Sequence, residues 1–255
     1  ARTTSEQMII NNLKVMESTS RYGFALPFLK GQCVLDIGCG ARRGPRIISK
    51  SNKRVIACDI SKEAIQFCQR NYPSSRISYV VADAIRLPFG SEIFDDVLAF
   101  EVVEHLDNQL NFLKEAHRVL KKGGMCILST PNRSVVSPQG VSDNPDHIHE
   151  FNFEGFRDFL RTDFSHIEFY GQGRTKKVQD IEMYRKKSYQ HISQIPIFLR
   201  RLLPKDIRHR CFRLYSNILS KIEISLAEDD VSEFDFPIEK DNVDKANYLL
   251  AICKK

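Results

Sequence analysis

The sequence predicts an α/β fold in which a largely parallel sheet is covered by helices on both faces. The main observation is that short β-rich runs alternate with helical stretches from Cys33 to about Phe164. This alternation is typical of successive strand–helix–strand units, which build parallel sheets. In addition, the 255 residues, 42% of them hydrophobic, are enough for one large domain with a continuous core.

The expected sheet has seven strands. Runs rich in β-branched and apolar residues predict strands at 33–37, 54–58, 77–81, 96–100, 125–129, 166–170 and 247–253. Helical patterns between them predict helices at 44–50, 62–71, 109–120 and 154–160. The last strand stands alone near the end of the chain, separated from the sixth by about seventy residues.

Helical segments flank this core on both sides. Residues 4–20 predict a polar helix with an apolar stripe, and 21–29 a second short helix that stops at Lys30 and Gly31. The long segment before the last strand predicts helices at 195–203 and 207–224, separated by Pro204. That segment has too few apolar residues for a core of its own.

We therefore expect a single domain over residues 1–255. Its expected parts are N-terminal helices at 1–30, a core of alternating strands and helices at 31–171, a helical lid or insertion at 172–245 and the last strand at 246–255.

Charge and cysteine content restrict the location of the protein. The net charge of +6 is mild, and no apolar run is long enough to span a bilayer. The first ten residues are polar and lack the apolar segment of a signal peptide. Seven scattered cysteines with no CxxC pair support neither a zinc ribbon nor a dithiol site. We expect a cytoplasmic protein in a reducing compartment.

The strongest motif is the run VLDIGCG, from Val34 to Gly40, in which an apolar strand meets two glycines before a predicted helix. Glycine lets a ligand approach the backbone closely and permits positive φ. The start of the following helix offers free N–H groups at the carboxyl edge of the sheet. The motif thus predicts a ligand site at this edge.

Two aspartates end the next two strands. Asp59 lies about twenty residues past the glycines, the spacing at which an acidic residue reaches ribose hydroxyls. Alternatively, Asp59 or Ser61 caps the helix that starts at Lys62. Asp83 ends the third strand, where it could accept a hydrogen bond from an adenine amino group; alternatively, it forms an Asx turn before Pro88.

Together these motifs resemble those of the class I S-adenosylmethionine (SAM)-dependent methyltransferases, a family with a Rossmann-like fold. The matching segments are VLDIGCG, ACDIS, VVADAIRLPF, FDDVLAFEVVEHL, VLKKGGMCILSTPNR and HEFNFEGFRDFL. The resemblance implies an enzyme that binds SAM through Asp36, Gly38, Gly40, Asp59, Ile60, Asp83, Ala84 and Glu101. In this set, Asp36 and the glycines line the methionyl part, Asp59 holds the ribose, and Glu101 borders the methyl-transfer cleft.

The sequence departs from the family pattern after the second glycine, where Arg42 stands in place of another glycine. Positive charge near a helix start is disfavoured by the helix dipole, so we expect Arg42 and Arg43 to face solvent. Alternatively, one of them pairs with the SAM carboxylate, a role for which Arg21 and Tyr22 are rival candidates.

A second constellation joins Glu101, Glu104 and His105 with His147 further along the chain. It resembles the small-RNA 2′-O-methyltransferases, in which two Glu and two His hold Mg²⁺, and some ubiquinone-pathway O-methyltransferases share the Glu-x-x-Glu-His piece. The resemblance implies a divalent cation on these four residues. Mg²⁺ prefers oxygen ligands, so two imidazoles suit Mn²⁺, Fe²⁺ or Zn²⁺ better. Alternatively, the four residues are a polar cleft wall.

Without a metal, a hydroxyl acceptor still has to lose its proton. Imidazole changes charge near neutral pH, so His105 or His147 is a candidate catalytic base. We favour His147, because its loop is expected to overhang the carboxyl edge of the sheet.

The expected function is O-methylation of a small-molecule, sugar or lipid-linked acceptor. Insertions at the place of residues 172–245 commonly cover the acceptor in this family. Apolar and basic residues mix there, so peripheral membrane contact is an alternative to packing on the domain. Two other functions stay open. One is an RNA 2′-O-methyltransferase, although the sequence has no recognisable RNA-binding module. The other is a non-catalytic SAM-binding protein.

Overall fold

A computed structural model describes residues 4–139, 144, 146–183 and 231–255. The chain forms two compact units, which we treat separately. The larger unit comprises Ser18–Gly173 and Ile238–Lys255, and the smaller unit comprises Ala1–Glu17 and Arg174–Pro237. The predicted helices at 195–203 and 207–224 lie outside the described residues, so the lid stays a prediction. None of the described helices has the length and apolarity needed to span a membrane.

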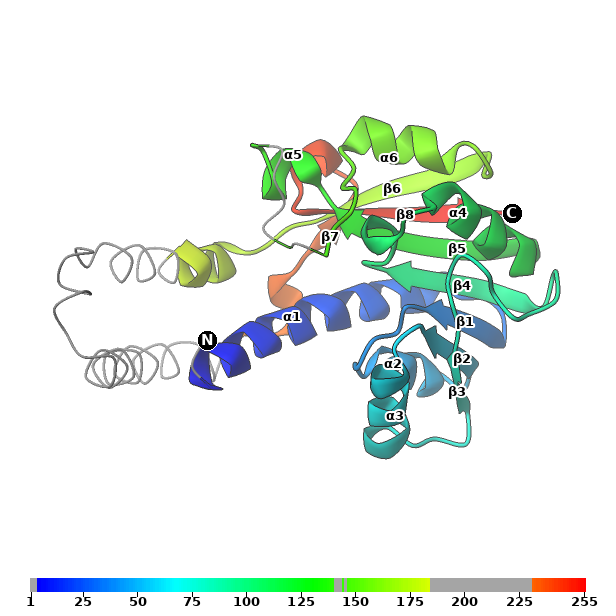
Figure 1. Cartoon of the computed structure of the whole chain (residues 1–255). Coiled ribbons are helices and arrows are strands. Elements are labelled where there is room, and N and C mark those ends of the chain that lie inside the picture. Colours follow the sequence, from blue (N-terminus) through cyan, green and yellow to red (C-terminus); the bar gives the residue numbers. More distant parts are fainter. Residues whose placement is uncertain (1–3, 140–143, 145, 184–230) are drawn as a thin grey trace, which may run out of the picture. The chain divides into compact units, whose positions relative to one another are not determined.

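The larger unit is built on one mixed sheet, whose strands run in the order β3-β2-β1-β4-β5-β8-β6-β7 (Figure 1). The strands are β1 (Cys33–Ile37), β2 (Arg54–Asp59), β3 (Ile77–Val81), β4 (Phe94–Phe100), β5 (Leu120–Pro131), β6 (His166–Gln172), β7 (Ile238–Glu239) and β8 (Tyr248–Lys254). The five strands from β3 to β5 pair in parallel, and β8 pairs antiparallel with both β5 and β6.

The expectation of seven strands was wrong by one. The additional strand, β7, pairs antiparallel with Gly171 and Gln172 at the end of β6. It spans two residues, too few for an alternating pattern to reveal it in the sequence.

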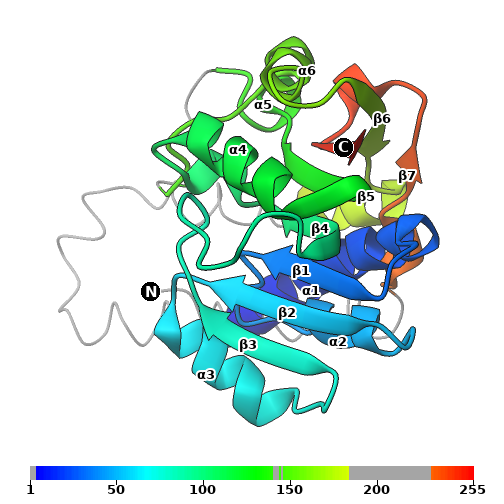
Figure 2. The same cartoon turned by 90° about the vertical axis from the view of Figure 1, so that its right-hand side faces the viewer.

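Helices cover both faces of the sheet (Figures 1 and 2). They are α1 (Thr4–Ala25), of which the part from Ser18 belongs to this unit, α2 (Gly44–Ser49), α3 (Lys62–Asn71), α4 (Gln109–Val119), α5 (Arg133–Val136) and α6 (Phe153–Leu160). Among the described residues, short 3₁₀ turns lie at η1 (Leu26–Phe28), η2 (Val103–His105), η3 (Glu233–Asp235) and η4 (Val243–Lys245).

Alternate residues of each strand belong to different cores, as the pleat requires. Along β4, Val97 packs with α4 and α6, whereas the next residue, Leu98, packs with the end of α1 and with α2 and α3. The central strands are thereby buried on both sides. Such burial is why they read as continuous apolar runs in the sequence.

The N-terminal region is one continuous helix, not the two helices expected at 4–20 and 21–29. Helix α1 runs to Ala25, and the chain turns only at η1, which contains Pro27. Tyr22 and Ala25 are buried in the core, so packing carries the helix past Gly23. A single glycine costs a helix only about 1 kcal/mol, which such burial outweighs.

The described part of the smaller unit has a small core of its own, formed by Leu13, Val178 and Phe236. Arg174 joins its segments, because it lies 2.9 Å from carboxylate oxygens of both Glu17 and Glu182. The functional side chains predicted from the sequence all lie in the larger unit, within or after the strands β1 to β5.

Candidate active site

The turn after β1 has the backbone that its glycines predict. Gly38 and Gly40 have φ of +68° and +56°. A Cβ on Gly38 would lie 2.4 Å from the Val102 side chain, so this glycine is needed for packing as well. A Cβ on Gly40 would meet only Arg42, at 4.0 Å. The space beside Gly40 is therefore open to the close approach of a ligand.

Asp59 is tied to this turn. Its Oδ2 accepts a hydrogen bond from the Gly40 N–H at 2.8 Å, and its Oδ1 accepts one from the Ser61 N–H at 2.8 Å. Ser61 caps α3, since its hydroxyl accepts from the Ala64 N–H, so the predicted capping role falls to Ser61. A carboxylate offers about four acceptor positions, which leaves capacity for ribose hydroxyls.

Three further predicted residues, Ile60, Asp83 and Ala84, lie just after the ends of β2 and β3. Ile60 is 72% exposed. Asp83 forms the predicted Asx turn, because its Oδ1 accepts from the Ile85 N–H at 3.0 Å. Ala84 next to it is buried. The turn and a ligand role of Asp83 are compatible, because the turn uses one carboxylate oxygen.

Asp36 is fully buried under the glycine turn, where the Tyr22 hydroxyl donates to its carboxylate. Burial raises the pKa of Asp36 to about 8, partly offset by the Tyr22 hydrogen bond. The Tyr22 hydroxyl is thus engaged in a hydrogen bond to Asp36. Arg42 and Arg43 are exposed, as expected for cations at the start of a helix.

Glu101 follows β4 with φ of +57°, which is rare for a residue with a side chain. Its Oε1 accepts from the Ser129 hydroxyl at 2.8 Å and lies 3.9 Å from Nη2 of Arg21. Arg21 is itself buried, donates to Gln172 at 2.7 Å and stacks over the Tyr248 ring at 4.4 Å. Glu101 therefore belongs to a polar network between α1 and the sheet.

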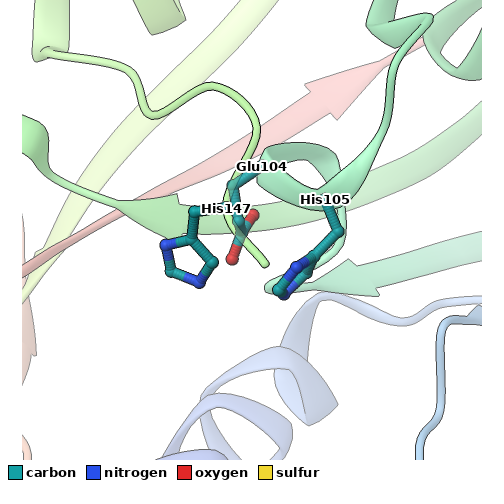
Figure 3. Close-up of side chains that lie close together, drawn as sticks. All are labelled: Glu104, His105 and His147. Atoms are coloured by element: carbon teal, nitrogen blue, oxygen red, sulfur yellow. The ribbon is translucent and has the colours of Figure 1, made fainter. Parts of the chain in front are cut away.

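Glu104, His105 and His147 come together, with one ligand atom from each lying within 4.8 Å of the others (Figure 3). The two imidazole rings meet edge to face, with centroids 4.8 Å apart. Glu101 is not part of this group, although the sequence analysis placed it there. Because of its left-handed backbone and the 3₁₀ geometry of η2, Glu101 and His105 do not share a face, as residues four apart on an α-helix would.

Backbone hydrogen bonds hold the His147 loop against η2. The Glu104 carbonyl accepts from the N–H groups of Ile148 at 2.8 Å and His149 at 3.2 Å. The Gln109 side chain donates to the Val103 carbonyl at 2.7 Å and to the His149 carbonyl at 3.4 Å. The placement of His147 beside His105 thus follows from contacts between segments some forty residues apart in the chain.

Both imidazoles are oriented through Nδ1. Nδ1 of His147 is hydrogen-bonded to Oε1 of Glu150 at 2.5 Å, and Nδ1 of His105 lies 2.9 Å from the Asp146 carbonyl oxygen. Glu150 is buried. Its role was not predicted from the sequence, although Glu150 lies three positions after His147. A carboxylate so close to a histidine in sequence is the signal that could have revealed it.

Glu104 is the most buried member of the group. Its side chain is 0% exposed, and Oε2 accepts from the Thr130 hydroxyl at 3.2 Å. Burial, and then the negative charge of Glu101, raise the pKa of Glu104 well above its ordinary value. A carboxyl group in this setting favours its neutral form unless a positive charge lies beside it.

Comparison with known proteins agrees with the geometry. A family model described as a methyltransferase domain matches residues 35–128, which include the glycine turn, Asp59, Asp83 and the Glu104–His105 pair. A probable SAM-dependent methyltransferase of Mycolicibacterium smegmatis is 34% identical over 149 residues, which are 56% of this chain and 57% of that protein.

Residues 35–128 therefore form a methyltransferase domain of the SAM-dependent type.

One more distant relative and one solved structure widen the comparison. The 27-O-demethylrifamycin SV methyltransferase of Amycolatopsis mediterranei is 30% identical over 137 residues, covering 52% of this chain and 50% of that enzyme. A Thermotoga maritima structure, described as a possible histamine N-methyltransferase, shares the fold with a TM-score of 0.60 at 14% identity, covering 98% and 99% of the two chains. The chain spans about half the length of the curated relatives it matches.

The cofactor side of the site fits SAM. The open space beside Gly40 admits a ligand against the backbone, and Asp59 keeps acceptor capacity next to it. Ile60 offers an exposed apolar surface at the same edge. These features agree with the cofactor residues that the family resemblance implies, whose individual contacts with SAM stay predictions.

Proposed function

We propose that this methyltransferase transfers the methyl group of SAM to a hydroxyl oxygen of a small-molecule acceptor. SAM supplies an electrophilic methyl group on a sulfonium. Attack by the acceptor oxygen forms the O–CH₃ bond as the S–CH₃ bond breaks, and the hydroxyl proton must leave. The protein's tasks are therefore to align the two reactants and to remove that proton.

The observation that carries the proposal is the bond between His147 Nδ1 and Glu150 at 2.5 Å. A buried carboxylate that holds one nitrogen of an imidazole orients the other nitrogen and stabilises the charged ring once it gains a proton. This is the arrangement of a general base. A hydroxyl acceptor needs a base, whereas a neutral amine can attack through its own lone pair.

The position of His147 supports the same conclusion. It lies beside His105 and Glu104, which follow β4, the strand next to the one that ends in the glycine turn. The proton of an acceptor held between the glycine turn and this group would pass to His147. The rifamycin relative, by its name an O-methyltransferase, adds support at the level of the family.

The proposal is tested with SAM labelled in its methyl group. The chain is incubated with a panel of phenols and sugars, a matched panel of amines, and RNA with free 2′-hydroxyls. We expect the label on a hydroxyl oxygen of a small molecule, located by mass spectrometry. Label on amines alone, or on RNA alone, would contradict the proposal, as would failure to bind SAM in calorimetry.

A further inference from the structure

Glu104, His105 and His147 present one carboxylate and two imidazoles to a common point (Figure 3). We propose that these three side chains bind a divalent transition-metal ion, such as Zn²⁺, Mn²⁺ or Fe²⁺. The inference deepens the proposed function and rests on it for the role of the ion in catalysis. The site is smaller than the four-residue set that the sequence suggests, because Glu101 is held by Ser129.

The spacing of the three side chains is close to that of a metal site. Ligand bonds of about 2.0–2.2 Å place two donor atoms on one cation about 3–4 Å apart. The atoms here lie within 4.8 Å of one another, so side-chain rotations that close about 1 Å would complete the site. His105 is exposed and can make such a rotation without disturbing the core.

The buried carboxylate gives an independent indication. Glu104 is 0% exposed, and its Oε1 has no hydrogen-bond partner in the part of the chain that the structure describes. Leaving a buried carboxylate oxygen unsatisfied costs free energy, and either a proton or a cation beside the carboxylate relieves that cost. In Figure 3 this carboxylate lies between the two imidazole rings. A metal ion at that point would satisfy it.

The outer contacts of the two histidines are those of metal ligands. Metal-binding imidazoles usually donate their other ring N–H to a carboxylate or a backbone carbonyl. Here Nδ1 of His147 bonds to Glu150, and Nδ1 of His105 bonds to the Asp146 carbonyl. Nε2 is then the ligand atom of each ring. The outer partner is a carboxylate for His147 and a backbone carbonyl for His105.

The donor set selects the class of metal. Two imidazoles and one carboxylate are the ligands of catalytic Zn²⁺ sites and of non-haem Fe²⁺ sites, whereas Mg²⁺ prefers oxygen. Three protein ligands leave positions open on the ion. An acceptor hydroxyl bound there would ionise more readily, and its proton would pass to water, because His147 would be a ligand. The resulting oxygen anion attacks the methyl group as before.

The test uses the full chain, treated with a chelator and dialysed. Calorimetry with Zn²⁺ and Mn²⁺, and the visible absorption of added Co²⁺, should show one site per chain. Glu104→Gln and His147→Gln should each weaken binding by at least about tenfold, since even the loss of an outer partner of a metal ligand has that effect. His166→Gln, which removes an exposed histidine on β6, should leave binding unchanged.

SAM binding by the same metal-free samples separates this inference from the proposed function. Equal SAM affinity in Glu104→Gln and the parent shows that the variant is folded. Absence of saturable metal binding, or equal binding by the parent and both site variants, overturns the metal site and leaves His147 as the base. Loss of SAM binding in the metal-free parent would instead count against the proposed function, whatever the metal result.

Discussion

The Tyr22 hydroxyl donates to both carboxylate oxygens of Asp36, at 2.9 and 3.1 Å, beneath the glycine turn. Burial raises the pKa of Asp36 from 3.8 to about 8. Between these values the folded chain keeps a proton that the unfolded chain releases. The free energy of unfolding should therefore fall as pH rises through this window, by up to about 1.4 kcal/mol per pH unit from Asp36.

Urea unfolding of the ligand-free protein at pH 5 and pH 7.5 measures this effect. Asp36→Asn should flatten the pH dependence relative to the parent. Tyr22→Phe removes the hydrogen bond that lowers the pKa of Asp36, so the fall in stability should continue to higher pH. Parallel pH profiles for the parent and Asp36→Asn would show that Asp36 is ionised in the folded state.

A second prediction separates backbone strain from steric contact at Gly38. Gly38→Ala should destabilise the fold by more than Gly123→Ala, because both residues have positive φ but only Gly38 faces a side chain, Val102, within 3 Å of the added carbon. Positive φ alone costs about 1–3 kcal/mol. Gly23→Ala, in a helix with no atom within 4 Å, should be neutral or stabilise by about 0.4–1 kcal/mol. Thermal denaturation ranks the three variants, and equal losses at Gly38 and Gly123 would refute the role of Val102.

The order of the core strands and helices along the chain was predictable because each depends on local pattern. The apolar run before Gly38 predicts a buried strand, and a serine before a helical pattern predicts the cap at Ser61. The predicted exposure of Arg42 and Arg43 was confirmed for the same reason, since a helix dipole acts locally.

What could not be predicted depends on contacts distant in sequence. Glu104 and Glu101 look equivalent in the sequence. In the structure Glu101 has a left-handed backbone and accepts a hydrogen bond from Ser129, whereas Glu104 is buried. The hydrogen bonds from the Glu104 carbonyl fix the His147 loop, and no periodicity encodes them. The continuity of α1 past Gly23 likewise depends on burial of Tyr22 and Ala25, a tertiary effect.

A third prediction concerns Asp59. If this carboxylate holds the SAM ribose, Asp59→Ala should weaken SAM binding by roughly tenfold or more, the scale of a lost charge-assisted hydrogen bond. Asp59 also accepts from Gly40 and Ser61, so Asp59→Asn, which keeps an acceptor oxygen, should lose less. Glu63→Ala, on the neighbouring helix, is the control and should bind like the parent. Unchanged affinity of Asp59→Ala in calorimetry would remove Asp59 from the cofactor site.

The last prediction concerns Glu150, whose only proposed task is to orient His147. Glu150→Gln keeps the size of the side chain and removes its charge, so the imidazole loses the partner that fixes its ring and supports its basicity. Turnover should fall by about 10- to 100-fold, whether His147 acts as a base or as a metal ligand. SAM affinity should stay within about twofold of the parent, because Glu150 is hydrogen-bonded to His147, which is not among the residues proposed to hold SAM. Single-turnover rates with labelled SAM measure turnover, and calorimetry measures SAM affinity.

Glu154→Gln, at the start of α6, is the matched control for loss of one carboxylate from the same segment. If Glu150→Gln turns over at the parental rate, His147 needs no orienting carboxylate, and the argument for O-methylation loses its main support.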